Sequence, residues 1–197
     1  MNSFLYNLNQ ISLSRQDTDI IKNVSLEIRS GERINIYGKN GSGKTSLLKI
    51  LSGITVATEG LLEISSTFNR HGDIFYMGHK YGLNNNLSVY DNLKYYLKFK
   101  NIDALDIIAS QLSHYGLGDY IYKEVKYLSH GQKKIVVLCA LRITNYKVWI
   151  LDEPYTGLDA VSCNKLNEDV IQHTANGGTV IVTSHDTIEI YKNWELL

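Results

Sequence analysis

The order of apolar and polar positions predicts a chain with strands towards both ends. Val148–Leu151 and residues 179–183 are runs of apolar or β-branched side chains, which is typical of parallel strands buried on both faces. Arg33–Tyr37 places Ile34 and Ile36 at alternate positions and predicts another short strand. Further strands are expected at residues 3–14, 23–28, 59–64 and 73–77, the first two as the opening of an antiparallel sheet.

The middle of the chain has helical periodicity. From residue 89 to about residue 127, apolar side chains recur at helical spacing, and no strand pattern appears. These apolar positions are Leu93, Tyr96, Leu97, Leu105, Ile108, Ala109 and Leu112. We therefore expect one domain, residues 1–197, with a helical subdomain inserted at about residues 82–127. Shorter helices are predicted at residues 46–51 and 133–142.

Composition narrows the classes of function. The 197 residues carry 20 Lys and Arg against 20 Asp and Glu, a balance that argues against a surface that coats nucleic acid. The two cysteines lack metal-ligand spacing, and Cys139 lies in an apolar helical run, so we expect its thiol to be buried. No apolar run approaches the roughly 18 residues of a membrane span, and residues 1–10 lack the pattern of a signal peptide. A role at a membrane would then depend on a partner and not on direct insertion.

The most specific motif lies between two predicted elements. Residues 38–45 read Gly-Lys-Asn-Gly-Ser-Gly-Lys-Thr and fit G-x-x-x-x-G-K-[ST], the phosphate-binding P-loop. The motif joins a strand to a helix, so backbone N–H groups and the helix dipole would face a polyphosphate. Lys44 is expected to reach the β- and γ-phosphates, and the Thr45 hydroxyl to ligate Mg²⁺. The candidate phosphate-binding residues are Gly38, Lys39, Asn40, Gly41, Ser42, Gly43, Lys44, Thr45 and Ser46.

Two carboxylates follow a predicted buried strand. Asp152 and Glu153 come directly after Val148–Leu151, and ligands bind at the carboxyl ends of parallel strands in open α/β sheets. Asp152 is expected to hold Mg²⁺ through water. Glu153 is placed to polarise an attacking water molecule. Alone, the pair is an ordinary strand-end turn before Pro154, but together with the P-loop it predicts nucleotide hydrolysis.

Three further segments resemble motifs of ATP-binding-cassette (ABC) ATPases. Residues 128–132, Leu-Ser-His-Gly-Gln, resemble the signature Leu-Ser-Gly-Gly-Gln, with a histidine in place of one glycine. The resemblance implies that Ser129, Gly131 and Gln132 contact nucleotide; a simpler alternative, compatible with it, is that Ser129 caps the following helix. Residues 156–159 resemble the D-loop through Asp159, and His185 resembles the switch histidine that contacts the γ-phosphate and the attacking water.

In chain order these motifs cover nearly the whole sequence and are specific to ABC ATPases. The resemblance implies an α/β fold, in which the P-loop ABC ATPase core carries an antiparallel β-subdomain and an inserted helical subdomain. It implies ATP hydrolysis with Mg²⁺, in which Lys44, Glu153 and His185 act in the reaction. It also implies a homodimer that sandwiches ATP head to tail, membrane-spanning transporter subunits as partners, and a peripheral location at the cytoplasmic face of the inner membrane.

Two departures from the ABC pattern narrow the resemblance. His79 stands where the Q-loop glutamine is usual, and Arg15 stands where an aromatic residue usually stacks on adenine; Tyr6 is a weaker candidate for that aromatic. Arg15 can stack its guanidinium on a base. With the short chain and the segment 149–159, these features resemble the ATP-binding subunits of heme exporters that serve cytochrome c maturation. The alternatives are a subunit of an ABC exporter for a drug, lipid or polysaccharide, and a non-transport ABC ATPase.

Overall fold

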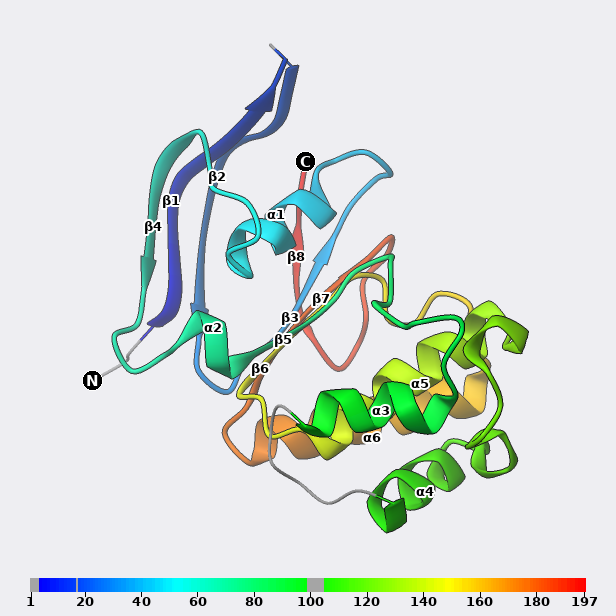
Figure 1. The fold of residues 1–197 in the computed structure, drawn as a ribbon. Coiled ribbons are helices and arrows are strands. Elements are labelled where there is room, and N and C mark those ends of the chain that lie inside the picture. Colours follow the sequence, from blue (N-terminus) through cyan, green and yellow to red (C-terminus); the bar gives the residue numbers. More distant parts are fainter. Residues whose placement is uncertain (1–3, 17, 99–104) are drawn as a thin grey trace. The chain divides into compact units, whose positions relative to one another are not determined.

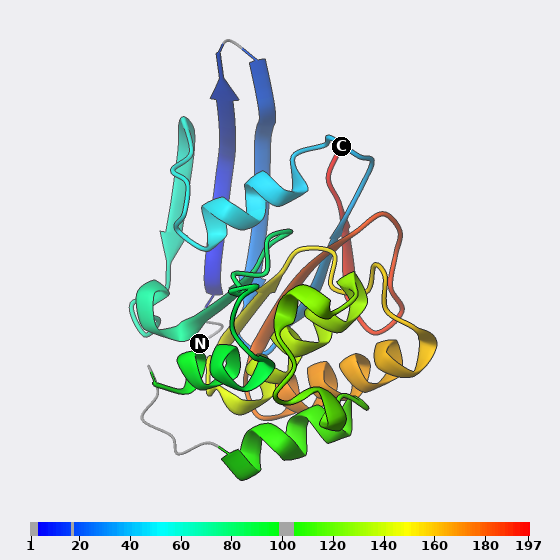
Figure 2. The ribbon, with the colours of Figure 1, turned by 45° about the vertical axis from the view of Figure 1, so that its right-hand side comes forward.

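Two sheets of different kind contain the strands of the described part of the chain (Figure 1). They are seen in a computed structural model that describes residues 4–16, 18–98 and 105–197. The antiparallel sheet has the order β2–β1–β4, and its strands run side by side in Figure 2. The parallel sheet has the order β5–β6–β7–β3–β8. The strands are β1 (Phe4–Arg15), β2 (Thr18–Arg29), β3 (Arg33–Tyr37), β4 (Glu59–Ile64), β5 (Ile74–Met77), β6 (Val148–Leu151), β7 (Thr179–Ser184) and β8 (Lys192–Glu195).

Helices connect the strands and fill the middle of the chain. The α-helices of the described residues are α1 (Lys44–Leu51), α2 (Arg70–Asp73), α3 (Val89–Lys98), α4 (Leu105–His114), α5 (His130–Ile143) and α6 (Ala160–Ala175). Short 3₁₀ turns lie at Gly118–Tyr120 and Val125–Tyr127. Among the described residues, no helix combines the length and the apolar character that crossing a membrane requires.

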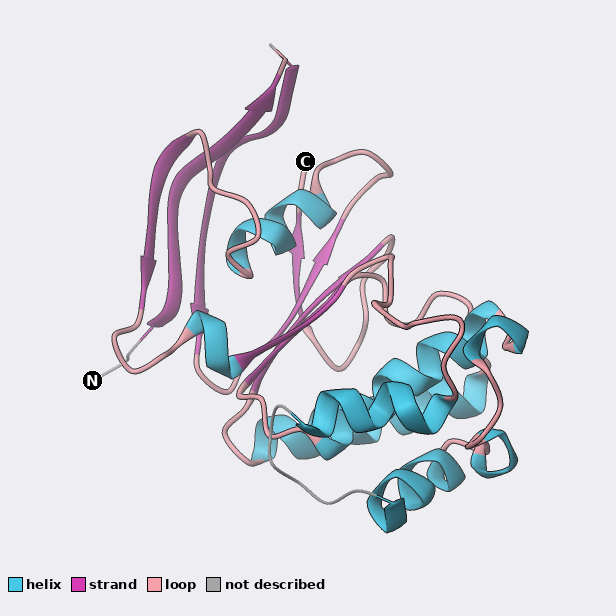
Figure 3. Ribbon diagram, viewed as in Figure 1, coloured by secondary structure: helices cyan, strands magenta, loops and turns pink. Residues whose placement is uncertain are grey.

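The chain forms two compact units. The first comprises Met1–Gly78, Tyr146–Pro154 and Val170–Leu197, and it contains both sheets. The second comprises His79–Asn145 and Tyr155–Asp169, and Figure 3 shows it as helices and loops. The α/β fold class expected from the sequence is confirmed, whereas the single domain with a helical subdomain at about residues 82–127 remains a prediction.

Most elements lie where the sequence places them, with shifted ends. α5 begins at His130 and not at residue 133, because Ser129 caps it, and α1 already begins at Lys44. β8, α2 and α6 were not predicted. Residues 99–104 of the expected helical stretch and residue 3 of the first expected strand lie outside the described residues.

α1 supplies one side of the core of the first unit. Its apolar side chains Leu47, Leu48, Ile50 and Leu51 are buried in one cluster with residues of β1, β2 and β3, and Figures 1 and 2 both draw α1 between the antiparallel sheet and β3. Full burial of one such side chain contributes about 1.5–3 kcal/mol. The helix that begins at the P-loop is therefore fixed by its own apolar face.

The second unit has a separate core made by its helices. Leu93 and Leu97 of α3 and Ile108 and Leu112 of α4 are fully buried, and both helices contact α5. Cys139 of α5 is buried as expected, and burial raises the pKa of its thiol to about 12. The thiol therefore stays protonated and serves in packing.

Candidate active site

The P-loop connects β3 to α1, and Gly43 makes the connection possible. Gly43 is the N-cap residue of α1 and has φ 96°, a conformation that side chains other than glycine's rarely adopt. A Cβ atom at this position would lie 2.6 Å from the backbone oxygen of Ile20. The chain therefore turns directly into α1, and the first N–H groups of the helix point back to the loop.

Lys44 and Ser42 give the loop groups that suit a polyphosphate. The Lys44 ammonium is nearly buried and donates hydrogen bonds of 2.6 Å to Gly38 O and 2.9 Å to Lys39 O. The buried Ser42 hydroxyl has no hydrogen-bond partner within the described part of the chain. A cation, a helix N-terminus and an unpaired hydroxyl on one glycine-rich loop form a fitting cradle for phosphate oxygens. Lys39, Asn40, Gly41 and Ser46 belong to the same loop and helix start.

Asp152 joins α1 to the ends of two neighbouring parallel strands. It follows β6 directly and is only 3% exposed. The Thr45 hydroxyl donates to Asp152 Oδ2 at 2.8 Å, and the Thr183 hydroxyl donates to Asp152 Oδ1 at 2.7 Å. A hydroxyl beside a carboxylate is an all-oxygen donor set of the kind that Mg²⁺ prefers together with substrate phosphates and water. Thr45 and Asp152 therefore fit the predicted metal site.

Glu153 is held in a specific backbone conformation. Its φ is 47°, which is unusual for a residue other than glycine and costs of the order of 1–3 kcal/mol. Its N–H donates to the Thr183 hydroxyl at 2.9 Å, so the neighbouring strand β7 fixes this conformation. The Glu153 side chain is 18% exposed, and its Oε1 lies 3.4 Å from Nε2 of His185. The two residues predicted to act on the attacking water thus face each other.

Asp152 also influences a partly buried tyrosine. Tyr76, on β5, lies beside β6 in the sheet. Burial, and after it the negative charge of Asp152, raises the pKa of Tyr76 to about 12. Tyr76 therefore remains a neutral phenol beside the carboxylate across the physiological pH range.

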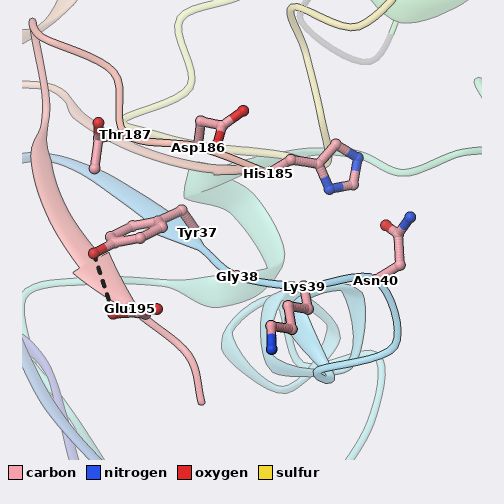
Figure 4. Close-up of a pocket in the computed structure, with 8 residues that line it drawn as sticks. All are labelled: Tyr37, Gly38, Lys39, Asn40, His185, Asp186, Thr187 and Glu195. Carbon is pink, nitrogen blue, oxygen red and sulfur yellow. Dashed lines mark hydrogen bonds between the residues drawn. The ribbon is translucent and has the colours of Figure 1, made fainter.

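A pocket of about 560 Å³ opens beside the P-loop (Figure 4). In Figure 4 the side chains of His185 and Asn40 extend into the same part of it. Its lining comprises Tyr37, Gly38, Lys39, Asn40, His185, Asp186, Thr187 and Glu195. The pocket thus combines the start of the P-loop with the loop that carries His185, and it is of the size of small-ligand sites.

The second unit contains the other predicted residues. Ser129 is the N-cap of α5: its side chain accepts from Gln132 N, and the Gln132 side chain accepts from Ser129 N. This is a capping box, so the simpler alternative for Ser129 is correct and its nucleotide contact stays a prediction. Gly131 tolerates no side chain, because a Cβ would lie 2.7 Å from Gly157 O.

His130 and Asp159 of the second unit also have defined partners. The Tyr81 hydroxyl lies 3.2 Å from His130 Nε2. The imidazole of His130, which replaces a glycine of the ABC signature, therefore lies against the ring of Tyr81. Asp159 Oδ1 accepts from Ser162 N at 2.7 Å at the start of α6. The hydrogen bonds from Ser162 lower the pKa of Asp159 and keep it ionised.

The residues that depart from the ABC pattern have different surroundings. Tyr6 is fully buried, and its hydroxyl donates to Leu51 O at 3.1 Å, so it cannot stack on a base. Arg15 is exposed at the end of β1, and His79 is exposed just after β5 at the start of the second unit. The nucleotide contacts of Arg15 and His79 remain predictions.

Thr183 is the site residue that sequence reasoning missed. It is fully buried, and its hydroxyl serves both Asp152 and Glu153. In the sequence it is one member of the apolar and β-branched run that predicts β7. Its only signal was its position two residues before His185, at the carboxyl end of a parallel strand.

Comparison with known proteins agrees with the arrangement of these motifs. The family described as ABC transporter matches residues 21–156. The cytochrome c biogenesis ATP-binding export protein CcmA of Shewanella frigidimarina (strain NCIMB 400) is 33% identical over 192 residues, which cover 94% of this chain and 88% of the relative. CcmA of Histophilus somni (strain 129Pt) is 35% identical over 188 residues, 92% of this chain and 87% of the relative.

Solved structures share the fold. A putative ABC transporter ATP-binding protein from Pyrococcus furiosus superposes with a TM-score of 0.83 at 24% identity, over 97% of this chain and 96% of that one. The structure of CbiO1 from Clostridium perfringens, part of the ABC transporter complex CbiONQ, superposes with a TM-score of 0.70 at 24% identity. The match covers 93% of this chain and 79% of that one. With the family match and the CcmA relatives, these findings show that the chain belongs to the ABC transporter family of ATP-binding proteins, among the relatives of CcmA.

Proposed function

We propose that this chain is the ATP-hydrolysing subunit of a membrane complex that exports or delivers heme during cytochrome c biogenesis. One observation supports the hydrolytic part above all others. The P-loop helix, the carboxylates after β6 and the end of β7 are joined by hydrogen bonds centred on Asp152 and Thr183, and His185 lies 3.4 Å from Glu153. Support for the cytochrome c part comes from the CcmA relatives, which align along nearly the whole chain.

Each residue of the site has a separate task in hydrolysis. Lys44 and the N–H groups of the P-loop bind the β- and γ-phosphates of ATP, and thereby hold the γ-phosphorus in place. When bound at Thr45 and Asp152, Mg²⁺ neutralises charge on the phosphate oxygens. Glu153 orients and polarises the attacking water. His185, 3.4 Å from Glu153, donates a hydrogen bond to the γ-phosphate side of the reaction.

A complete site requires two copies of the chain in this proposal. Ser129 and Gly131, at the N-terminus of α5, bind the γ-phosphate of the ATP held by the P-loop of the partner copy. Asp159 and Gln132 lie near the same contact between copies. This homodimer closes on ATP and opens after hydrolysis. These movements are transmitted to the membrane-spanning subunits.

The membrane-spanning part of the complex must come from other subunits. ABC ATP-binding proteins act with such partners, and we place this chain at the cytoplasmic face of the inner membrane, bound to them peripherally. Arg15 is the proposed contact for adenine. His79, in the position of the Q-loop glutamine, is the proposed link between the nucleotide site and the membrane partner.

Deletion in the source organism tests the heme assignment. Removal of the gene should abolish heme-stained c-type cytochromes while b-type cytochromes persist, and a plasmid copy should restore them. A copy with Glu153→Gln should not restore them, whereas a copy with Lys22→Ala, an exposed residue of the first unit, should. Normal c-type cytochromes in the deletion strain would rule out the cytochrome c role, without affecting the proposal that the chain hydrolyses ATP.

A further inference from the structure

A buried amide lies in the middle of the parallel sheet. Asn35 is the central residue of β3, is 0% exposed, and is flanked in sequence by the fully buried Ile34 and Ile36. β3 has β7 on one side and β8 on the other. A buried amide is unfavourable unless its donors and its acceptor are all used. The partners of Asn35 therefore indicate why this residue is compatible with the fold.

Asn35 binds the residues on both sides of His185. The Ser184 hydroxyl donates to Asn35 Oδ1 at 2.8 Å, and Asn35 Nδ2 donates to Asp186 O at 2.9 Å. Asn35 Nδ2 also donates to Asn193 Oδ1 on β8 at 2.8 Å. One side chain of the sheet thus binds the Ser184 hydroxyl immediately before the switch histidine and the Asp186 carbonyl immediately after it.

Asn193 extends the network along the loop that follows His185. Its Oδ1 accepts from Ile188 N at 2.8 Å, and its Nδ2 donates to Ile188 O at 3.0 Å and Tyr191 O at 3.1 Å. The backbone donor of Ile188 fixes which end of the Asn193 amide is the oxygen. That oxygen in turn requires the NH₂ group of Asn35 to face it, so the orientations of both amides are determined.

The opposite side of β7 is fixed by Thr183. Its hydroxyl binds Asp152 Oδ1 and Glu153 N, as described above. His185 therefore follows a strand end that is tied to β6 through Thr183 and to β3 through Ser184. Side chains that touch the reacting groups have to be held within a fraction of an ångström, and hydrogen bonds behind them usually do this.

We propose that Asn35 and Asn193 are positioning residues for His185, which keep its ring directed to Glu153 and to the pocket of Figure 4. The inference rests on the proposed ATPase function. Asn35 acts from inside the sheet and Asn193 from the last strand, so β8 is part of the catalytic framework. Neither residue touches the nucleotide in this account, so their loss should lower kcat and leave the KM for ATP nearly unchanged.

Asn193→Ala is the main test, because Asn193 is exposed and its replacement should permit folding. We expect kcat to fall about tenfold, because the histidine loses its fixed orientation. Hydrogen exchange of the peptide covering residues 184–191 should become faster, while β3 stays protected. Asn35→Leu should likewise lower kcat and make hydrogen exchange at residues 184–191 faster. Asn7→Ala, which removes an asparagine bonded to Glu63 on the antiparallel sheet, is the matched control and should change neither quantity.

A double-mutant cycle separates positioning from general destabilisation. If Asn193 acts through His185, Asn193→Ala should have little further effect on kcat in a His185→Ala protein. Additive losses, or an unchanged kcat despite faster exchange at residues 184–191, would overturn the proposal. In either case, activity of the wild type and its loss in Glu153→Gln would leave the ATPase function intact. A wild-type protein without ATPase activity would instead overturn the proposed function, and the positioning role with it.

Discussion

The Thr45 hydroxyl donates a hydrogen bond of 2.8 Å to Asp152 Oδ2, although 107 positions separate the two residues in the chain. The other oxygen of the same carboxylate accepts from Thr183 at 2.7 Å. Both oxygens of a buried carboxylate are thus engaged by hydroxyl groups from different elements. The P-loop helix and the ends of β6 and β7 therefore meet at one side chain, which joins the P-loop to the strand ends that precede Glu153 and His185.

Thr183→Val should weaken both stability and turnover. The substitution keeps the shape of the side chain but leaves Asp152 Oδ1 and Glu153 N–H without their shared partner. Unsatisfied buried groups cost about 1–3 kcal/mol, and we expect a loss of that order in urea unfolding together with a lower kcat. Thr183→Ser keeps the hydroxyl and should recover most of both. Wild-type stability and turnover in Thr183→Val would show that the Thr183 hydroxyl is unimportant.

Lys44→Ala should weaken nucleotide binding rather than slow the reaction alone. Its ammonium is the buried cation of the P-loop, and hydrogen bonds to charged groups contribute about 1.5–3 kcal/mol. The affinity for a fluorescent ATP analogue should therefore fall at least about tenfold, measured by titration. Lys22→Ala, whose side chain is 74% exposed, should bind like the wild type. Equal affinity of Lys44→Ala and wild type would exclude Lys44 as the phosphate ligand.

The signature serine can be tested apart from its capping role. Glu153→Gln with ATP should form a dimer that light scattering detects, and the dimer should be absent without nucleotide. Ser129→Asp keeps a good N-cap for α5 but places a negative charge where the γ-phosphate of the partner copy should bind. This second change should prevent the dimer without lowering the stability of the monomer. A dimer that persists in the Glu153→Gln, Ser129→Asp protein would contradict the proposed arrangement.

His173 should make the fold less stable in acid. Its ring stacks on Trp149 with centroids 3.9 Å apart, and burial lowers its pKa below the ordinary value, an effect only partly offset by the hydrogen bond to Lys147 O. The unfolded chain then binds the proton more tightly than the folded chain. The stability that neutral His173 contributes is fully present above about pH 6.5, the ordinary pKa of histidine in the unfolded chain. It is lost as the pH falls through the lower pKa that His173 has in the folded chain.

Unfolding by urea between about pH 5 and pH 8 measures this contribution. His173→Phe keeps the stack on Trp149 and removes the titrating group, so its stability should depend less on pH than that of the wild type. His71→Gln, at an exposed histidine of the same unit, is the control and should follow the wild-type curve. Identical pH profiles for His173→Phe and wild type would refute the role of His173.

The predictable parts of the molecule are those encoded by neighbouring residues. The P-loop, β3 and β6 follow from short patterns in which glycine, lysine or a run of apolar residues decides the local structure. α6 was missed because its helical pattern is weak: Leu166 and Val170 are buried, but polar residues such as Ser162 and Asp169 are buried with them. β8 was missed because Lys192–Glu195 is mostly polar and becomes a strand only by pairing with β3.

The supporting residues of the site could not be predicted for a related reason. Thr183 acts on a carboxylate 31 positions away, and Asn35 acts on a serine 149 positions away. Neither residue belongs to a sequence motif that predicts a functional site. Only the order of strands in the parallel sheet brings their side chains to their partners. The residues proposed to touch substrate belong to sequence motifs, whereas the residues that hold them in place are brought there only by the tertiary structure.

ATP turnover by the wild type and by Glu153→Gln, measured side by side with saturating Mg²⁺ and ATP, tests the central claim most directly. The amide of glutamine occupies the same space but cannot polarise water as the carboxylate does. We predict that Glu153→Gln binds the fluorescent ATP analogue as tightly as the wild type and hydrolyses ATP at least about a hundredfold more slowly. A Glu153→Gln protein that turns over ATP near the wild-type rate would contradict the account, because the carboxylate held by Thr183 opposite His185 would then have no part in the reaction.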